Sequence, residues 1–194
     1  YITTTLPYVN ADPHIGFALE IVQADVIARY RQQQGDEVFF NTGVDEHGLK
    51  VFRKAQEKKL TTLAYCDILV KKFKNLKQDL SLNYNSFIRT TDARHIKAAQ
   101  EFWRRCAENG DIYKKDYKIK YCVGCELEKQ ESELVGGRCP LHSKEEIEII
   151  CEENYFFRYS RYQNKLLKLY QENAEFVLPK SKFNEIKNFR RACH

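Results

Sequence analysis

The 194 residues are enough for one domain or for a domain with a small appendage, and a hydrophobic fraction of 43%, with twelve Phe and twelve Tyr, argues against disorder. The net charge of +5 is mild, and the sequence has neither a bilayer-length apolar run nor a basic-then-apolar leader. We therefore expect a cytoplasmic protein that has no membrane partner.

The pattern of apolar residues predicts alternating strands and helices over the first part of the chain. In chain order we expect a strand at 1–6, a helix at 12–34, a strand at 37–44, helices at 49–59 and 61–80, a strand at 86–90 and a helix at 92–109. This alternation is typical of a parallel sheet with crossover connections. The predicted fold class is therefore α/β.

The first predicted helix has a clear start and an apolar face. Asp12 is a favourable N-cap residue and Pro13 suits the first helical position. Apolar residues then recur at helical spacing, which predicts the face that the helix buries. These residues are Ile15, Leu19, Val22, Val26 and Tyr30.

The composition changes after residue 110, where short β-like pieces rich in Tyr and Lys replace the alternating pattern. We expect one domain at 1–110 and a second region at 111–194, with a return to helix at 164–171. The chain lacks Met, begins inside a strand-like run and shows no helix-stop signal at its end, so it is expected to be a fragment of a longer protein.

The turn after the first predicted strand contains residues suited to an anionic ligand. His14 and Gly16 are expected in the first helical turn, where free N–H groups and the helix dipole favour an anion. Gly16 would let a ligand approach the backbone, and His14 could donate a hydrogen bond to a phosphate. The alternative is that His14 is an ordinary capping or surface residue.

The turn after the second predicted strand gathers polar residues at the same edge of the sheet. Asp45, Glu46 and His47 follow the strand directly, and Gly48 follows them. Because a polar cluster after a buried strand is costly unless it is solvated or functional, we expect these residues to line a pocket. The alternative is a loop with a helix cap.

Four residues in two close pairs have the spacing of metal ligands. They are Cys122, Cys125, Cys139 and His142. Two such pairs can bring four ligands to the corners of a tetrahedron, and a zinc ion with four protein ligands is structural. The odd number of cysteines, seven, argues against a disulfide framework. Unmetallated buried thiols are the alternative.

These motifs together resemble those of the class I aminoacyl-tRNA synthetases, and in particular the methionine-specific family. Pro13-His14-Ile15-Gly16 is similar to the "HIGH" signature of the class. The further motifs that carry the resemblance are Leu6-Pro7-Tyr8-Val9-Asn10, Thr42-Gly43-Val44-Asp45-Glu46-His47-Gly48, Phe87-Ile88-Arg89-Thr90-Thr91 and Glu152-Glu153-Asn154-Tyr155-Phe156-Phe157. The resemblance implies the first half of a Rossmann-like catalytic domain, followed by a connective insertion with one zinc knuckle.

The resemblance also implies an activity and its site residues. The family activates L-methionine with ATP, with Mg²⁺, and transfers it to tRNA(Met). His14 would stabilise the phosphates as a catalytic residue, and Asn10 and Gly16 would shape the ATP pocket. Tyr8 and Leu6 would line the methionine pocket, and Asp45 would pair with the ammonium group of methionine.

One position departs from the family pattern. Phe17 stands where the signature has its second His, and Phe cannot donate a hydrogen bond to a phosphate. By analogy with the loss of one oxyanion donor, an uncompensated change would cost about 3 kcal/mol, on the order of a hundredfold in rate. Phe17 is therefore left out of the expected catalytic set.

Two other classes of protein remain open from the residues alone. One is another class I synthetase or a small nucleotidyltransferase, and the other is a zinc-containing nucleic-acid-binding module. Synthetases for branched amino acids carry a large editing insertion, for which this chain has no room. The binding module would have no affinity for ATP.

Further expectations concern the isolated chain and RNA. Since the "KMSKS" half and the anticodon-binding domain do not appear before His194, the isolated chain should be inactive or nearly so in methionyl-adenylate formation. Reversing the charges around the knuckle, at Lys114, Lys115, Lys118 and Lys120, should weaken tRNA binding. The assignment as a whole requires that the loops with Tyr8 and Asp45 leave adjacent parallel strands side by side.

Overall fold

In a computed structural model of the chain, residues 1–189 are described, and residues 190–194, the end of the second predicted region, lie outside them. By their contacts these residues form two units. The first unit contains Tyr1–Gln100 and Ile119–Ile150, and the second contains Glu101–Lys118 and the described residues from Cys151 onward. The boundary near residue 110 came from composition, and it stays a prediction.

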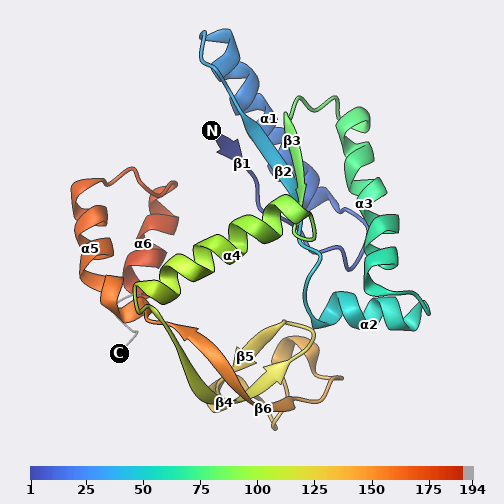
Figure 1. The fold of residues 1–194 in the computed structure, drawn as a ribbon, viewed down its shortest axis with the longest axis vertical. Coiled ribbons are helices and arrows are strands. Elements are labelled where there is room, and N and C mark those ends of the chain that lie inside the picture. Colours follow the sequence, from blue (N-terminus) through green and yellow to red (C-terminus); the bar gives the residue numbers. More distant parts are fainter. Residues whose placement is uncertain (190–194) are drawn as a thin grey trace. The chain divides into compact units, whose positions relative to one another are not determined.

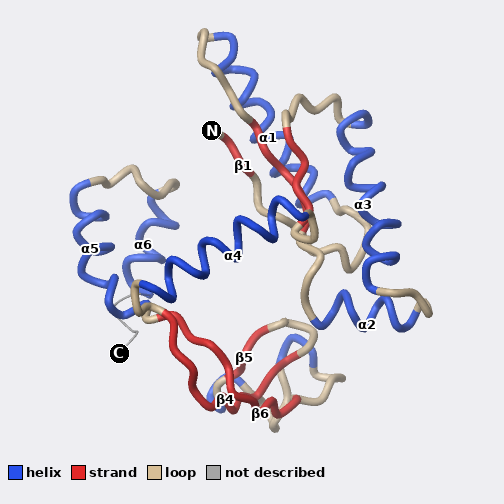
Figure 2. The backbone as a smooth tube through the Cα atoms, in the orientation of Figure 1, coloured by secondary structure: helices blue, strands red, loops and turns tan. Residues whose placement is uncertain are grey.

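The first unit contains the parallel sheet that was predicted. Its strands are β1 (Ile2–Thr3), β2 (Phe40–Val44) and β3 (Ser86–Arg89), in the order β1-β2-β3 with both pairs parallel (Figure 1). The helices between and after them are α1 (Ile15–Gln33), α2 (Leu49–Glu57), α3 (Thr62–Asp79) and α4 (Ala93–Glu108), whose second half belongs to the second unit. Figure 2 shows the same alternation of strand and helix along the chain.

All three strands are shorter than predicted, β1 and β2 by several residues and β3 by one. β1 ends at Thr3, since Glu20 of α1 accepts hydrogen bonds at 2.7 Å from both the backbone N–H and the hydroxyl of Thr5. β2 begins at Phe40, which is the residue that pairs with Ile2 near the start of β1.

The buried face of α1 is not the predicted one. Ile15 is 88% exposed and Leu19 60% exposed, whereas Phe17, Ile21 and Ala28 are buried in the core with α3 and β2. Of the other predicted residues, Val22, Val26 and Tyr30 are also exposed. The helix carries apolar residues on two sides, and helical spacing fits both. The buried side is the one that packs into the core with α3 and β2.

The start of α1 also differs from the prediction. The helix begins at Ile15 with His14 as its N-cap, not at Pro13 with Asp12. Asp12 instead pairs with Lys72 of α3 at 2.7 Å, so its carboxylate is turned away from the helix. The start of α3 agrees with the sequence, since the Thr61 hydroxyl accepts a hydrogen bond from Ala64 N at 3.2 Å.

Gly43 in β2 allows the close approach of β3. A Cβ at this position would lie 2.0 Å from Ile88 O, far inside contact distance. We expect Gly43→Ala to lower the free energy of unfolding by about 3 kcal/mol, because the paired strand must move. Urea denaturation will measure the change. Gly35→Ala is the comparison: at φ +92 its Cβ would meet nothing within 4 Å, so a cost near 1 kcal/mol is expected. Equal effects of the two substitutions would contradict the packing argument.

The first unit also contains the tip of the insertion. β4 (Ile112–Cys122) pairs antiparallel with β5 (Leu127–Lys129), and β6 (Glu148–Phe157) flanks β4 on its other side. Two 3-10 turns, Glu131–Glu133 and Pro140–His142, follow β5. This tip contacts α2 through an ion pair between Arg53 and Glu148 at 2.7 Å.

The second unit contains the stem of the insertion and two helices. Asp111 is buried at the start of the stem, where it pairs with Arg161 at 2.7 Å and accepts a hydrogen bond from the Tyr162 hydroxyl at 2.5 Å. The helices are α5 (Gln163–Glu172), where a helix was predicted, and α6 (Lys180–Phe189). Among the described residues, no helix has both the length and the apolar character that a membrane span requires.

Candidate functional site

The two polar loops that follow β1 and β2 lie side by side. Asp45 N donates to Pro7 O at 2.9 Å, and Val9 N donates to Asp45 O at 3.1 Å. Tyr8 and Asp45 therefore form a parallel bridge beyond the ends of the two strands. The adjacency on which the assignment depends is thus present, and the enclosure of a common pocket by the two loops stays a prediction.

The first loop is attached to α3 at two points. The Tyr65 hydroxyl donates to Asn10 O at 3.1 Å, and Lys72 contacts both carboxylate oxygens of Asp12 at 2.7 and 2.8 Å. Together with the contact of Glu20 to Thr5, these bonds hold the loop on both sides of Tyr8. The loop is therefore positioned by helices that it joins or packs against.

His14 caps α1 with its own ring. Its Nδ1 accepts a hydrogen bond from Gly16 N at 3.1 Å, so a neutral His14 carries its proton on Nε2. The ring is exposed, and that proton is available to an anionic ligand. Gly16 makes room for the ring, because a Cβ there would lie 3.0 Å from His14 Cε1. The backbone N–H of Gly16, which was expected to face an anion, is already used by the cap.

Phe17 belongs to the core. Its side chain is only 5% exposed and packs edge-to-face on Phe73 of α3, with ring centroids 5.6 Å apart. The position that holds a second His in the family signature is therefore an apolar contact between α1 and α3 in this chain.

The second loop presents one carboxylate and buries another. Asp45 is partly exposed, and its Oδ1 accepts hydrogen bonds from His47 N at 3.1 Å and from the Thr90 hydroxyl at 3.4 Å. Gly48 has φ +110, a conformation that suits glycine, and α2 begins directly after it. Glu46, which was expected to line the pocket with His47 and Gly48, is only 2% exposed.

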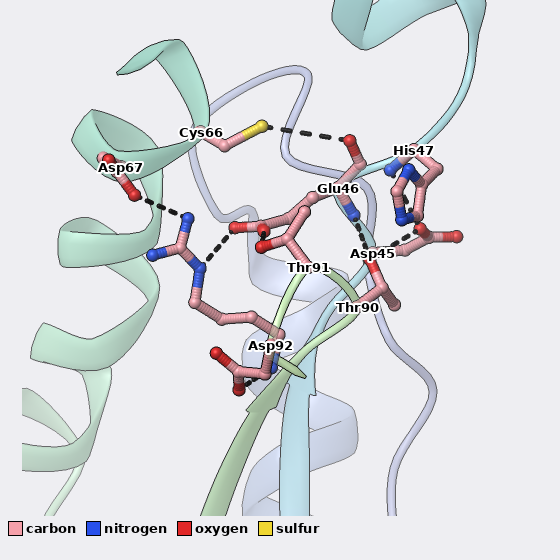
Figure 3. A network of polar contacts seen from close by, with 9 residues as sticks. Asp45, Glu46, His47, Cys66, Asp67, Thr90, Thr91 and Asp92 are labelled. Atoms are coloured by element: carbon pink, nitrogen blue, oxygen red, sulfur yellow. Dashed lines mark hydrogen bonds and ion pairs between the residues drawn. The ribbon is translucent and has the colours of Figure 1, made fainter. Parts of the chain in front are cut away.

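The side chain of Glu46 points into a polar network between β3 and α3 (Figure 3). Its Oε1 accepts from Arg89 Nε at 2.7 Å, and its Oε2 accepts from the Thr91 hydroxyl. The nearby thiol of Cys66 faces Glu46 O, with Sγ and O 3.9 Å apart. Burial, and next the negative charge of Glu46, raises the pKa of the Cys66 thiol to about 11, so Cys66 is an unreactive thiol at neutral pH.

The four predicted metal ligands lie together at the tip of the insertion. Their ligand atoms, one each from Cys122, Cys125, Cys139 and His142, are all within 4.8 Å of one another. Cys125 Sγ lies 3.5 Å from Cys139 Sγ and 3.2 Å from His142 Nδ1. Tetrahedral zinc with bonds of about 2.3 Å to sulfur separates its ligand atoms by about 3.8 Å, so the cluster fits such an ion.

Sequence reasoning missed Glu126, which follows the second cysteine of the cluster. Its backbone is in the left-handed region, with φ +54, and its carboxylate lies near Gly48 of the second loop. Glu126 Oε1 would lie 3.8 Å from a Cβ at Gly48, and Tyr8 Cε1 would lie 3.9 Å from the same atom. Burial, then the charges of Asp45 and Glu126, raises the pKa of Tyr8. Only the position beside a predicted metal ligand could have drawn attention to this carboxylate.

Comparison with known proteins places the chain in a family. The model of the family described as "tRNA synthetases class I (M)" matches residues 1–151. The chain belongs to this family. The methionine–tRNA ligase of Thermosynechococcus vestitus is 47% identical over 189 residues, which cover 97% of this chain and 36% of the relative. That of Thermotoga maritima is 46% identical over 190 residues, covering 96% of this chain and 30% of the relative.

The solved structures of the family support the same assignment. Methionyl-tRNA synthetase of Mycobacterium tuberculosis in complex with methionyl-adenylate superposes with a TM-score of 0.92 at 38% identity, over 98% of this chain and 38% of that one. A leucine enzyme of Agrobacterium radiobacter, in a complex with tRNA, shares only the fold, at 19% identity and a TM-score of 0.74. The chain spans about a third of the length of these methionine-specific relatives.

Proposed function

We propose that this chain supplies the ATP- and methionine-binding half of the catalytic domain of a methionine–tRNA ligase. The observation that carries the proposal is the direct backbone pairing of the Tyr8 loop with the Asp45 loop, at the edge of the sheet where the family binds its substrates. The M. tuberculosis relative, which matches 98% of this chain, is bound to methionyl-adenylate, the product of the first reaction step.

In the first step a carboxylate oxygen of methionine attacks the α-phosphorus of ATP, and the bond to the pyrophosphate oxygen breaks. Catalysis of such a transfer is mainly positioning and charge stabilisation. His14 would donate its Nε2 proton to a phosphate oxygen, since its Nδ1 already accepts from Gly16 N. Asn10 and Gly16 would border the nucleotide, and ATP would bind with Mg²⁺.

The methionine itself would lie against the paired loops. Asp45 would accept hydrogen bonds from the ammonium group, and the exposed ring of Tyr8 with Leu6 would contact the thioether side chain. His47 and Gly48 would border this site from the second loop. The activated methionine then passes to the terminal ribose of tRNA(Met). A cytoplasmic location follows from a role in translation.

A structural zinc ion is the second part of the proposal. Three thiols and one imidazole are the ligands that zinc prefers, and four protein ligands leave no position for a reacting water. Zinc would cross-link the tip of the insertion and thereby fix the direction of Glu126. It would take no part in the chemistry.

The test uses a chimera in which this chain is followed by the rest of the T. maritima relative. Methionine-dependent exchange of pyrophosphate into ATP by the chimera is the expected result, and the isolated chain should show little or none. A folded chimera that binds neither ATP nor methionine would contradict the proposal. Robust exchange by the isolated chain would overturn the expectation that the rest of the catalytic domain is required.

tRNA is the proposed macromolecular partner. The ion pairs in the structure indicate which lysine around the knuckle to test first. Lys114 pairs with Glu153 at 2.7 Å, and Lys120 pairs with Glu131, so their charges are partly neutralised. Lys118 is exposed and has no anionic partner among the described residues. We expect Lys118→Glu to weaken tRNA binding by the chimera about three- to tenfold at low salt and less at high salt, and Lys114→Glu to have the smaller effect. Filter binding over a salt series measures both, and equal affinities for wild type and Lys118→Glu would contradict a role in RNA binding.

A further inference from the structure

A buried carboxylate lies directly behind the methionine-binding carboxylate that we propose. Glu46 follows Asp45 in the chain, and its side chain has no exposed surface. It accepts from Arg89 Nε at 2.7 Å, and Arg89 Nη2 lies 2.6 Å from Asp67 Oδ1 on α3, as an ion pair not aligned as a hydrogen bond (Figure 3). The three charges therefore connect the end of β2, the end of β3 and α3.

Stability alone does not explain such a network, because removing its charges from water costs free energy that the ion pairs only offset. A buried carboxylate needs a partner. Replacing a buried ion pair by apolar residues of similar volume often leaves the stability unchanged or raises it. The network also restrains the backbone of Glu46, because the Glu46 side chain is held at both Arg89 and Thr91. The direction of the Glu46 N–H is fixed with it.

That N–H connects the network to Asp45 through Thr90. Glu46 N donates to the Thr90 hydroxyl at 2.9 Å, so the lone pair that faces Glu46 is used. The hydroxyl proton is then free to point at Asp45 Oδ1, 3.4 Å away. Asp45 Oδ1 also accepts from His47 N at 3.1 Å. Among the described residues no hydrogen bond reaches the other oxygen, Asp45 Oδ2.

We propose that Thr90 is a positioning residue for methionine: held by the Glu46–Arg89–Asp67 network, its hydroxyl orients the Asp45 carboxylate so that Oδ2 faces the ammonium group of the substrate. This inference rests on the proposed function of Asp45. Thr90 itself touches no substrate, and it acts only through Asp45. The side chain is 8% exposed, so its hydroxyl has these two partners and little access to water.

The test compares two buried threonines in the chimera, Thr90 directly after β3 and Thr42 within β2. Thr90→Val removes the hydroxyl while keeping the shape of the side chain, and Thr90→Ser keeps the hydroxyl. Thr42→Val is the matched control, because the Thr42 hydroxyl is also buried and bonds to the Thr4 hydroxyl at 2.8 Å, away from Asp45. Pyrophosphate exchange gives KM for methionine and KM for ATP separately, and thermal unfolding gives the stability of each variant.

We expect Thr90→Val to raise KM for methionine about tenfold, as for the loss of one hydrogen bond to a charged group, and to leave KM for ATP within about twofold. Thr90→Ser should restore KM for methionine. Thr42→Val should lower stability by a similar amount and leave both KM values unchanged. If Thr90→Val does not fold, Thr90→Ala must show the same separation of the two KM values.

A cycle with Asp45→Ala, which removes both the carboxylate and the oxygen that accepts from Thr90, shows whether Thr90 acts through Asp45. Once the carboxylate is gone, Thr90→Val should have no further effect on KM for methionine, and additive effects would overturn the inference. An unchanged KM for methionine in Thr90→Val, or equal rises for methionine and ATP, would also overturn it. Failure of the proposed function is a separate result, because the unmodified chimera would then show no methionine-dependent exchange.

Discussion

Removing the metal ligands will unfold the tip of the insertion while the parallel sheet stays folded. The apparent binding free energy of structural zinc is about 10–16 kcal/mol in small zinc-binding peptides, and it is folding free energy because the site does not exist in the unfolded chain. The tip has little else to hold it, since the only buried residues of Ile119–Ile150 are Ile119 and two of the predicted ligands, Cys122 and Cys139. The sheet has its own apolar core with α1 and α3.

Cys139→Ala is the variant and Cys151→Ala is its control, because Cys151 is exposed and lies outside the cluster. We expect about one zinc per chain in the control and almost none in Cys139→Ala. Amide hydrogen exchange should speed up across residues 119–150 in Cys139→Ala and stay unchanged in β1, β2 and β3. A protein purified without zinc whose tip exchanges as slowly as that of the control would contradict a structural metal.

The second large effect is expected at His14. Loss of one preorganised donor to a phosphate costs about 3 kcal/mol, which is on the order of a hundredfold in rate. In this chain no second imidazole can compensate from the first turn of α1, because Phe17 is buried against Phe73. We therefore expect His14→Ala to lower the rate of pyrophosphate exchange by the chimera about a hundredfold.

His14 also caps α1, so a loss of stability must be separated from a loss of chemistry. An N-cap substitution by Ala costs about 1 kcal/mol, whereas Asn is itself a good N-cap residue. His14→Asn should therefore unfold at nearly the wild-type temperature and still lose most of the rate. If His14→Asn kept the full rate, the role of His14 would be confined to the helix cap.

The position of Phe17 shows how a family motif and a local environment can differ. The motif predicts a ligand-facing residue at this position, whereas the spacing of Phe17, Ile21, Ala24 and Ala28 places it on the buried face of α1. That spacing was available in the sequence. A second apolar stripe, the one with Leu19 and Val26, has the same period. Only the contact with α3 and the sheet distinguishes the two stripes.

The sequence indicated that these loops are polar, but not which of their side chains point to solvent. Asp45 and Glu46 are adjacent carboxylates at the end of β2, and alternation along an extended chain sends neighbouring side chains to opposite sides. Which of them meets solvent depends on Arg89, a residue 43 positions further along the chain whose guanidinium lies against Glu46. The contact of Glu126 with the second loop is of the same kind, since it depends on how the tip of the insertion packs near Gly48.

The sequence by itself determined the order of strands and helices, the four Cys and His residues that cluster at the tip and the pairing of two polar loops at one edge of the sheet. Those features depend on local propensity, on short spacings and on the rule that parallel strands share an edge, so neighbours in the chain suffice to predict them. The tertiary structure alone decided the buried face of α1, the inward turn of Glu46 and the contact of the Thr90 hydroxyl with Asp45. Each of these is a choice between alternatives of equal local energy, and contacts between distant residues make that choice.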